Sequence, residues 1–120
     1  MSCAKEDLQL FLLKLDNSRK LIVVEGKKDE RSLRELGISN AIVVLNKKPL
    51  YSVVEQVVAL SKDVVILTDL DRTGRSLYSR LKKDLSERKV TVDNYFREFL
   101  FKNTKVRQIE GLSKYLKNLT

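Results

Sequence analysis

Two aspartates separated by one residue follow an apolar segment in the middle of the chain. Residues 64–67 are apolar throughout and lead through Thr68 to Asp69 and Asp71. In an extended segment, residues i and i+2 point to the same side, so both carboxylates can bind one ion while Leu70 turns inward. The chain has no histidine, and carboxylate oxygens favour Mg²⁺, with Mn²⁺ as an alternative, over zinc.

A further acidic residue follows the first apolar segment, where residues 21–24 lead directly into Glu25 and Gly26. If the two apolar segments form neighbouring parallel strands, Glu25 lies near Asp69 and Asp71 at the edge where open α/β sheets bind their ligands. The three carboxylates could then hold one Mg²⁺, or two ions that clamp a phosphate. Glu25 could instead act as a general acid or base, if neighbouring carboxylates raise its pKa.

These carboxylates also have a purely structural interpretation. A Glu or Asp that follows a strand often caps the next helix. Taken alone, Glu25 is better explained as such a cap, whereas the spacing of Asp69 and Asp71 favours metal binding. The three residues together favour a metal site.

Basic residues and glycines flank the acidic positions. Four cations are placed to hold phosphates beside a metal; they are Lys27, Lys28, Arg72 and Arg75. Taken singly, each is better explained as a solvated charge at the start of a helix, and Arg72 is the strongest candidate for phosphate binding among them. Gly26 and Gly74 would let the backbone approach a ligand closely. The formal net charge of +8 fits RNA or DNA as a partner, although a solvated, lysine-rich surface gives the same total.

Apolar periodicity alternates between strand-like and helical segments. Short apolar runs predict strands buried on both faces, at residues 21–24, 41–45 and 64–67, with a fourth at 105–109. Helical spacing predicts helices at residues 5–15, 28–36, 50–58, 73–88 and 111–119. Residues 94–102 are interpreted as a short helix, with a strand as the alternative. This alternation predicts an α/β fold with about four mostly parallel strands flanked by helices.

Length and composition limit the class of protein. The 120 residues suit a single domain over 1–120, and the hydrophobic fraction of 42% describes a soluble globular protein. No apolar run approaches the ~20 residues that span a membrane, and the start of the chain lacks the pattern of a secretory signal. The one cysteine, Cys3, forms no internal disulfide, so we expect a cytoplasmic protein. The absence of histidine excludes Ser-His and Cys-His nucleophiles.

Two motifs in this order resemble the Toprim domain. They are Ile22-Val23-Val24-Glu25-Gly26-Lys27-Lys28-Asp29 and, about 40 residues later, Val65-Ile66-Leu67-Thr68-Asp69-Leu70-Asp71-Arg72-Thr73-Gly74. A glutamate after the first strand and an Asp-x-Asp after the third are more specific together than either alone, and the resemblance covers residues 21–112. It implies a compact, Rossmann-like α/β fold, Mg²⁺ bound by the acidic residues, and breakage or joining of phosphodiester bonds in nucleic acid.

Carried over by position, the resemblance implies Glu25 as the catalytic acid or base and Asp69 and Asp71 as metal ligands. Residues 108–112 resemble the closing strand of the maturase-like and primase-like members. Thr73 stands where primase-like members often carry another acidic residue, which argues against a second metal. The chain lacks room for the further domains of topoisomerases and primases, and is similar to the small standalone Toprim proteins of archaea. Such a protein could be a nuclease or part of a larger RNA- or DNA-processing complex with protein partners.

Two alternatives remain beside an Mg²⁺-dependent nuclease, a hydrolase of RNA or DNA. Residues 69–73 also fit Asp-x-Asp-x-Thr, the nucleophile loop of haloacid-dehalogenase-like phosphatases, in which the first Asp attacks phosphorus. That family carries a further acidic pair downstream; none follows Thr73 at a strand end, and Glu25 would have no role. The other alternative is a non-catalytic nucleic-acid-binding module that keeps the metal site for docking.

Overall fold

The strands that carry the two acidic motifs end side by side. The computed structural model describes residues 4–119, and Cys3 lies outside the described residues. Within them the strands are β1 (Leu21–Val24), β2 (Ile42–Val44), β3 (Asp63–Leu67) and β4 (Thr91–Val92). They form one parallel sheet in the order β2-β1-β3-β4. β1 and β3 are central neighbours, with Val24 paired to Leu67 at their carboxyl ends.

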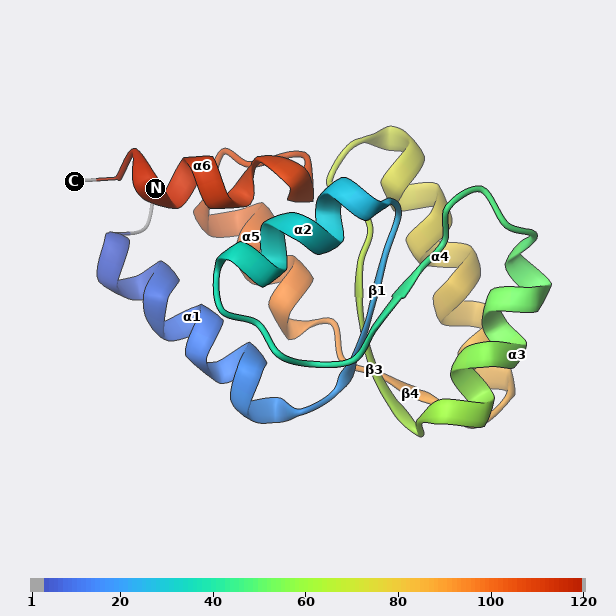
Figure 1. Cartoon of the computed structure of the whole chain (residues 1–120). Helices are drawn as coiled ribbons and strands as arrows, with labels where there is room; N and C mark the ends of the chain where they lie inside the picture. The colour runs from blue at the N-terminus through green and yellow to red at the C-terminus, as the bar shows by residue number, and fades with distance from the viewer. Residues whose placement is uncertain (1–3, 120) are drawn as a thin grey trace.

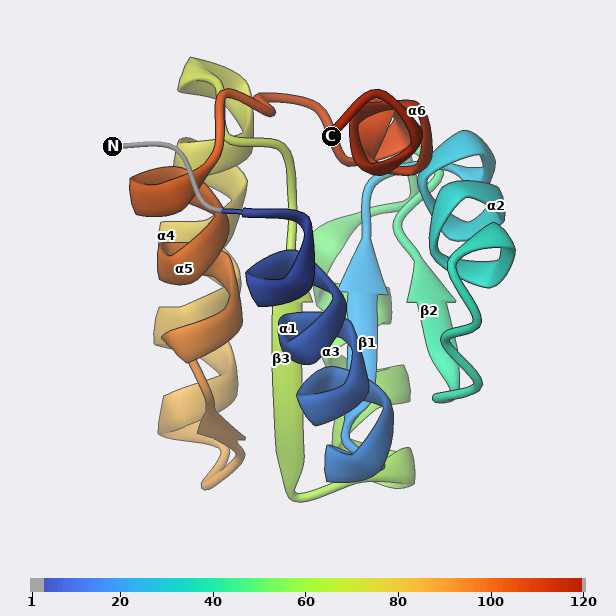
Figure 2. The ribbon, with the colours of Figure 1, turned by 90° about the vertical axis from the view of Figure 1, so that its left-hand side faces the viewer.

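Six α-helices of the described chain surround this sheet. They are α1 (Lys5–Ser18), α2 (Lys27–Glu35), α3 (Leu50–Leu60), α4 (Arg72–Glu87), α5 (Tyr95–Asn103) and α6 (Leu112–Lys117). α3 and α4 cover one face of the sheet, and α1, α2 and α5 cover the other (Figure 1). α6 lies across the carboxyl end of the sheet (Figure 2). None of the helices in residues 4–119 combines the length and the apolar character that crossing a membrane requires.

The apolar runs at residues 21–24 and 64–67 become strands buried on both faces, as the sequence predicts. Successive side chains of a strand point to opposite faces, and β1 divides accordingly. Ile22 and Val24 pack in the cluster beneath α1, α2 and α5, whereas Leu21 and Val23 pack against α3 and α4. Burial of each such side chain contributes about 1.5–3 kcal/mol, so the sheet is held firmly and the positions of its strand ends are well defined.

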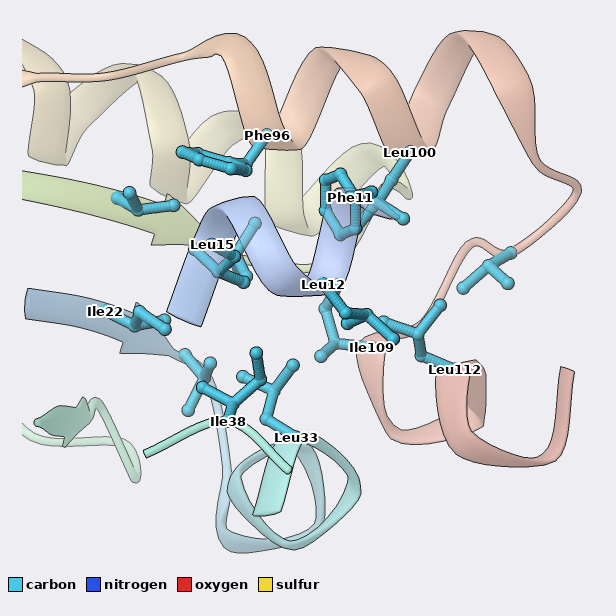
Figure 3. Packing of buried hydrophobic residues seen from close by; sticks show 14 of the residues in the cluster. Phe11, Leu12, Leu15, Ile22, Leu33, Ile38, Phe96, Leu100, Ile109 and Leu112 are labelled. Atoms are coloured by element: carbon cyan, nitrogen blue, oxygen red, sulfur yellow. The ribbon is translucent and has the colours of Figure 1, made fainter. Parts of the chain in front are cut away.

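α1 closes the larger apolar cluster and fixes α5 against the sheet. Phe11 and Leu15 of α1 point into this cluster, between β1 and α5 (Figure 3). The ring of Phe11 also stacks on Phe99 of α5, with the ring centres 4.8 Å apart. Such aromatic pairs add about 0.5–1.5 kcal/mol to the burial of their area. The position of α5 matters because this helix contributes a residue to the candidate site.

The α/β class, the parallel sheet and the helix at residues 94–102 are confirmed, but the fourth strand is predicted wrongly. β4 is the fourth strand and pairs with the first residues of β3. Residues 105–108 are irregular and Ile109–Gly111 forms a 3-10 helix, so the closing strand at residues 108–112 is wrong as well. Val106 and Ile109, three residues apart, are both buried in the larger cluster. A strand would direct them to opposite faces.

Candidate active site

Glu25, Asp69 and Asp71 lie together at the carboxyl edge of the sheet. Glu25 directly follows β1, and the two aspartates follow β3. The backbone N–H of Asp69 donates a hydrogen bond to Oε2 of Glu25 over 2.7 Å. The expected proximity of these residues, which depended on β1 and β3 being neighbours, is therefore confirmed.

The loop that carries Asp69 is held from several sides. Oδ1 of Asp69 accepts a hydrogen bond from the backbone N–H of Ile109 at 3.0 Å. The N–H of Leu70 donates to the carbonyl oxygen of Arg107 at 2.7 Å, while the Leu70 side chain is buried. Each such bond contributes about 0.5–1.5 kcal/mol net. The loop is therefore bound both to Glu25 after β1 and to the segment that precedes α6.

Asp71 caps α4, whereas Glu25 caps no helix. Oδ1 of Asp71 accepts a hydrogen bond from the backbone N–H of Gly74 at 2.8 Å. The N-cap of α2 is Gly26, and its N–H donates to Oδ2 of Asp29 at 2.9 Å. The interpretation of Glu25 as a cap is therefore wrong, and the capping role belongs to Asp71.

One oxygen of each of the three carboxylates stays available to a cation. Oε1 of Glu25, Oδ2 of Asp69 and Oδ2 of Asp71 accept no hydrogen bond from the described residues. Across residues 4–119, no three acidic or cysteine side chains converge closely enough to enclose an ion. Mg²⁺ usually keeps several waters and uses only one or two carboxylates. The donor set therefore fits Mg²⁺ better than an ion that needs a closed protein cage.

Burial and repulsion between neighbouring carboxylates raise the pKa values of Glu25 and Asp69. Desolvation is the main cause of the raised pKa of Glu25, and the charges of Asp69, Asp71 and Asp29 add to it. Desolvation also raises the pKa of Asp69, and there Asp71 and Glu110 add to it. Asp29 and Glu110 extend the negative cluster, although sequence reasoning gave neither a role. A bound cation would relieve this repulsion.

We expect the metal-free protein to be more stable at mildly acidic pH than at neutral pH. Glu25 and Asp69 have a higher pKa in the folded state, so the folded protein binds more protons and its stability falls as the pH rises through these values. Asp16 and Asp93 act in the opposite sense. Hydrogen bonds from Ser39 lower the pKa of Asp16, and the stability that these two residues contribute is lost only below about pH 4.

For Asp93, burial acts to raise the pKa, but hydrogen bonds from Lys20 and from the N–H of Tyr95 outweigh it. Thermal melting should therefore show a melting temperature that is lower at neutral pH than at mildly acidic pH. Millimolar Mg²⁺ should raise the melting temperature more at neutral pH than at mildly acidic pH. A metal-free melting temperature that climbs steadily to neutral pH would contradict the raised pKa values.

The four predicted phosphate-binding residues stand at the starts of two helices. Lys27 and Lys28 begin α2, and Arg72 and Arg75 lie in the first turn of α4. All four are exposed. Among the described residues, none of the four forms an ion pair with an acidic side chain. The cations therefore lie next to the acidic residues in the chain and are free to contact phosphates.

Gly74 has a steric role, whereas Gly26 has none. A Cβ atom at Gly74 would lie 1.9 Å from the carbonyl oxygen of Asp69, while one at Gly26 would meet its nearest atom at 3.8 Å. The hydroxyl of Thr68 donates to the carbonyl oxygen of Gly74 at 2.7 Å. Gly74 thus lets the start of α4 pack directly on the backbone of Asp69. That Gly26 supports a ligand stays a prediction.

Arg97 of α5 is a site residue that sequence reasoning misses. Its guanidinium donates to the carbonyl oxygen of Asp69 at 2.8 Å and lies 4.7 Å from the centre of the Tyr78 ring. Desolvation lowers the pKa of Arg97, and the nearby charges of Glu25 and Asp71 oppose that change. Arg97 thus connects α5, α4 and the acidic loop. Only the fold brings these three together, and no local motif marks the residue.

Replacing Arg97 with lysine should destabilise the protein. Lysine keeps the charge but loses the planar group that lies over Tyr78 and reaches Asp69. We expect the free energy of unfolding to fall by about 1–3 kcal/mol, measured by urea denaturation. Arg80→Lys, at an exposed position of α4, should change it by less than about 0.5 kcal/mol. Equal effects of the two substitutions on the free energy of unfolding would show that the Arg97 contacts do not stabilise the protein.

A known family matches the part of the chain that contains these residues. A family model described as the Toprim domain matches residues 20–101, which include β1, β3 and the acidic residues that follow them. The chain belongs to the Toprim domain family. Toprim membership indicates a metal-dependent function related to nucleic acid, with the metal bound by acidic residues.

Several proteins are similar to this Toprim protein over most of its length. A UPF0292 protein of Methanocaldococcus jannaschii is 35% identical over 107 residues, which cover 87% of this chain and 84% of that protein. A UPF0292 protein of Pyrococcus abyssi is 36% identical over 110 residues, covering 89% and 82%. Among solved structures, a protein from Aquifex aeolicus matches with a TM-score of 0.78 and 30% identity, covering 86% of this chain and 95% of that chain. These names state no activity.

Proposed function

We propose that this Toprim protein cleaves phosphodiester bonds in nucleic acid with the help of Mg²⁺. The observation that carries the proposal is the hydrogen bond from the N–H of Asp69 to Glu25, because it joins the acidic residues of two strands at one edge. Asp69 and Asp71 would hold the ion, with Glu25 as a further ligand or as the proton carrier. Mg²⁺ at this site supplies charge that polarises the phosphate and stabilises the transition state.

Glu25 suits the role of proton carrier. General acid–base catalysis works best when the pKa lies near the working pH, and the pKa of Glu25 is raised towards it. Its Oε2 is fixed by the N–H of Asp69, while Oε1 is free to exchange a proton. The side chain is therefore oriented by one oxygen and reactive at the other.

Lys27, Lys28, Arg72 and Arg75 would position the nucleic-acid backbone beside these carboxylates. Contacts between basic side chains and phosphates give affinity without sequence information. The formal net charge of +8 supports a polyanionic substrate, RNA or DNA, and makes its binding salt-dependent. We place the protein in the cytoplasm, because a chain that forms no internal disulfide suits a reducing compartment.

A non-catalytic nucleic-acid-binding module is the second candidate. The observation in its favour is that no three acidic side chains within residues 4–119 converge to enclose an ion. Such a module would bind RNA or DNA through its basic residues, together with protein partners in a larger processing complex. The phosphatase alternative gains no support, because the family match is to the Toprim domain.

A cleavage panel with purified protein separates these functions. Structured RNA, single-stranded DNA, duplex DNA and a small phosphate monoester are each tested with Mg²⁺, Mn²⁺ or EDTA. A nuclease should cut one polymer with metal and lose the activity in Asp69→Asn and Asp71→Asn. Asp63→Asn, an exposed position at the opposite end of β3, should remain active. Salt-sensitive binding without cleavage would support the binding module, and hydrolysis of the monoester alone would support the phosphatase.

A further inference from the structure

A pocket of about 440 Å³ opens beside the acidic edge, and Asp71 forms part of its lining. The rest comes from the segment before the 3-10 helix, from the last residue of that helix, and from α6 with the residue that follows it. α6 lies across the carboxyl end of the sheet (Figure 2). The lining residues that matter here are Arg107, Gln108, Lys114, Tyr115 and Asn118. The cleavage proposed above assigns none of these five a role.

The lining offers the contacts that an unpaired nucleotide requires. The ring of Tyr115 can stack on a base. The amides of Gln108 and Asn118 can both donate and accept hydrogen bonds at a base edge. Arg107 and Lys114 supply positive charge for phosphate. The volume also falls within the range of about 300–1,000 Å³ that small-molecule sites occupy.

Arg107 is held in place before any ligand arrives. Its Nη1 donates to the carbonyl oxygens of Thr104 and Val106, at 3.1 and 2.8 Å. Its guanidinium lies 5.2 Å from the centre of the Phe101 ring. The backbone carbonyl of the same residue receives the N–H of Leu70 in the acidic loop. Arg107 therefore links the pocket to the acidic loop. A nucleic-acid strand that is bound in the pocket is positioned to reach the acidic site.

We propose that this pocket binds an unpaired nucleotide of the substrate, with its base on Tyr115 and its phosphate near Arg107 and Lys114, so that the adjoining phosphodiester reaches Asp71. The proposal rests on the proposed cleavage for the reaction at Asp71, but binding in the pocket needs no cleavage. It assigns single-stranded or locally unpaired nucleic acid as the substrate class, because a base inside a duplex must first leave its stack.

Binding of short oligonucleotides in EDTA tests the pocket without cleavage. Fluorescence anisotropy with labelled oligo(U) and oligo(dT) distinguishes RNA from DNA, and blunt duplexes of the same length provide the paired state. Wild-type protein should bind a single strand more tightly than a duplex. Tyr115→Leu should weaken single-strand binding by about tenfold, the loss of one base stack. Tyr115→Phe keeps the ring and should bind like the wild type.

Two further variants replace exposed side chains, Lys114 and Asn118. These substitutions should leave the fold intact, so that any change in binding reports on the pocket. Lys114→Gln should weaken binding and reduce the salt slope by about one, and Asn118→Ala should weaken binding several-fold if Tyr115→Leu fails to fold. Lys62→Gln is the matched control, because Lys62 is exposed and precedes β3 at the opposite edge of the sheet. Its binding should stay close to that of the wild type.

The outcomes separate this proposal from the proposed function. If Tyr115→Leu, Lys114→Gln and Asn118→Ala all bind like the wild type while Asp69→Asn abolishes cleavage, the proposed nucleotide binding in the pocket is wrong and the proposed nuclease activity is supported. If the variants lose single-strand binding but wild-type protein cuts nothing, nucleotide binding in the pocket is supported and the proposed nuclease activity is wrong. Equal wild-type affinity for single strands and duplexes also overturns the pocket.

Discussion

Gly74→Ala should destabilise the protein by about 3 kcal/mol or more and disorganise the acidic loop. The added methyl group would lie 1.9 Å from the carbonyl oxygen of Asp69, and this neighbour is backbone that cannot rotate away. Moving α4 outward would break the bond from the Thr68 hydroxyl to the Gly74 carbonyl oxygen. Thermal melting should show a loss of roughly 10 °C or more.

Gly111→Ala is the control for this substitution. Gly111 has a φ of −87°, and a Cβ atom there would meet nothing within 4 Å. Alanine should therefore be neutral or stabilise by about 0.4–1 kcal/mol, since it restricts the unfolded chain. A wild-type melting temperature for Gly74→Ala would show that α4 can move away from the Asp69 backbone at little cost.

Glu25→Gln should lower the cleavage rate by about 10²–10⁴-fold while the fold is preserved. Glutamine keeps an oxygen that can accept the hydrogen bond from the N–H of Asp69, so the link between the strand ends remains. It loses the negative charge and the ability to exchange a proton. Because burial and neighbouring carboxylates disfavour the charge on Glu25, we also expect the metal-free variant to melt a few degrees higher at neutral pH.

Single-turnover cleavage and thermal melting on the same preparation test both parts of this expectation. Glu55→Gln, at an exposed position of α3, should leave the rate and the melting temperature unchanged. A Glu25→Gln rate within tenfold of the wild type would remove Glu25 from the catalytic residues. A slower variant that also melts at a lower temperature would indicate damage to the fold instead.

Patterns within single segments were enough to predict β1 and β3 and the acidic residues that follow them. Both strands are apolar at every buried position, and their alignment as neighbours in a parallel sheet, which the sequence left as a condition, brings Glu25 to Asp69. The fourth strand could not be found in this way. β4 has only two residues, too few for a periodic pattern, and the apolar residues Val106 and Ile109 resembled a strand more strongly.

Site residues that depend on contacts between distant segments escaped prediction. Arg97 is one of 24 lysines and arginines, and only the packing of α5 against the sheet brings it to Asp69. The capping role of Asp71 was open to sequence reasoning, because an acidic residue before a helix is a common cap. It was assigned to Glu25 instead, since both residues follow a strand and precede a helix.

The hydrogen bonds that join the acidic loop to Arg107 and Ile109 set an order of assembly. Synthesis from the amino terminus completes β1 and β3 well before these two residues exist. The loop can take its final form only once residues 107–112 have been made and have folded back over the sheet. A growing chain that is still attached to the ribosome would therefore carry Glu25, Asp69 and Asp71 before the acidic loop has its final form.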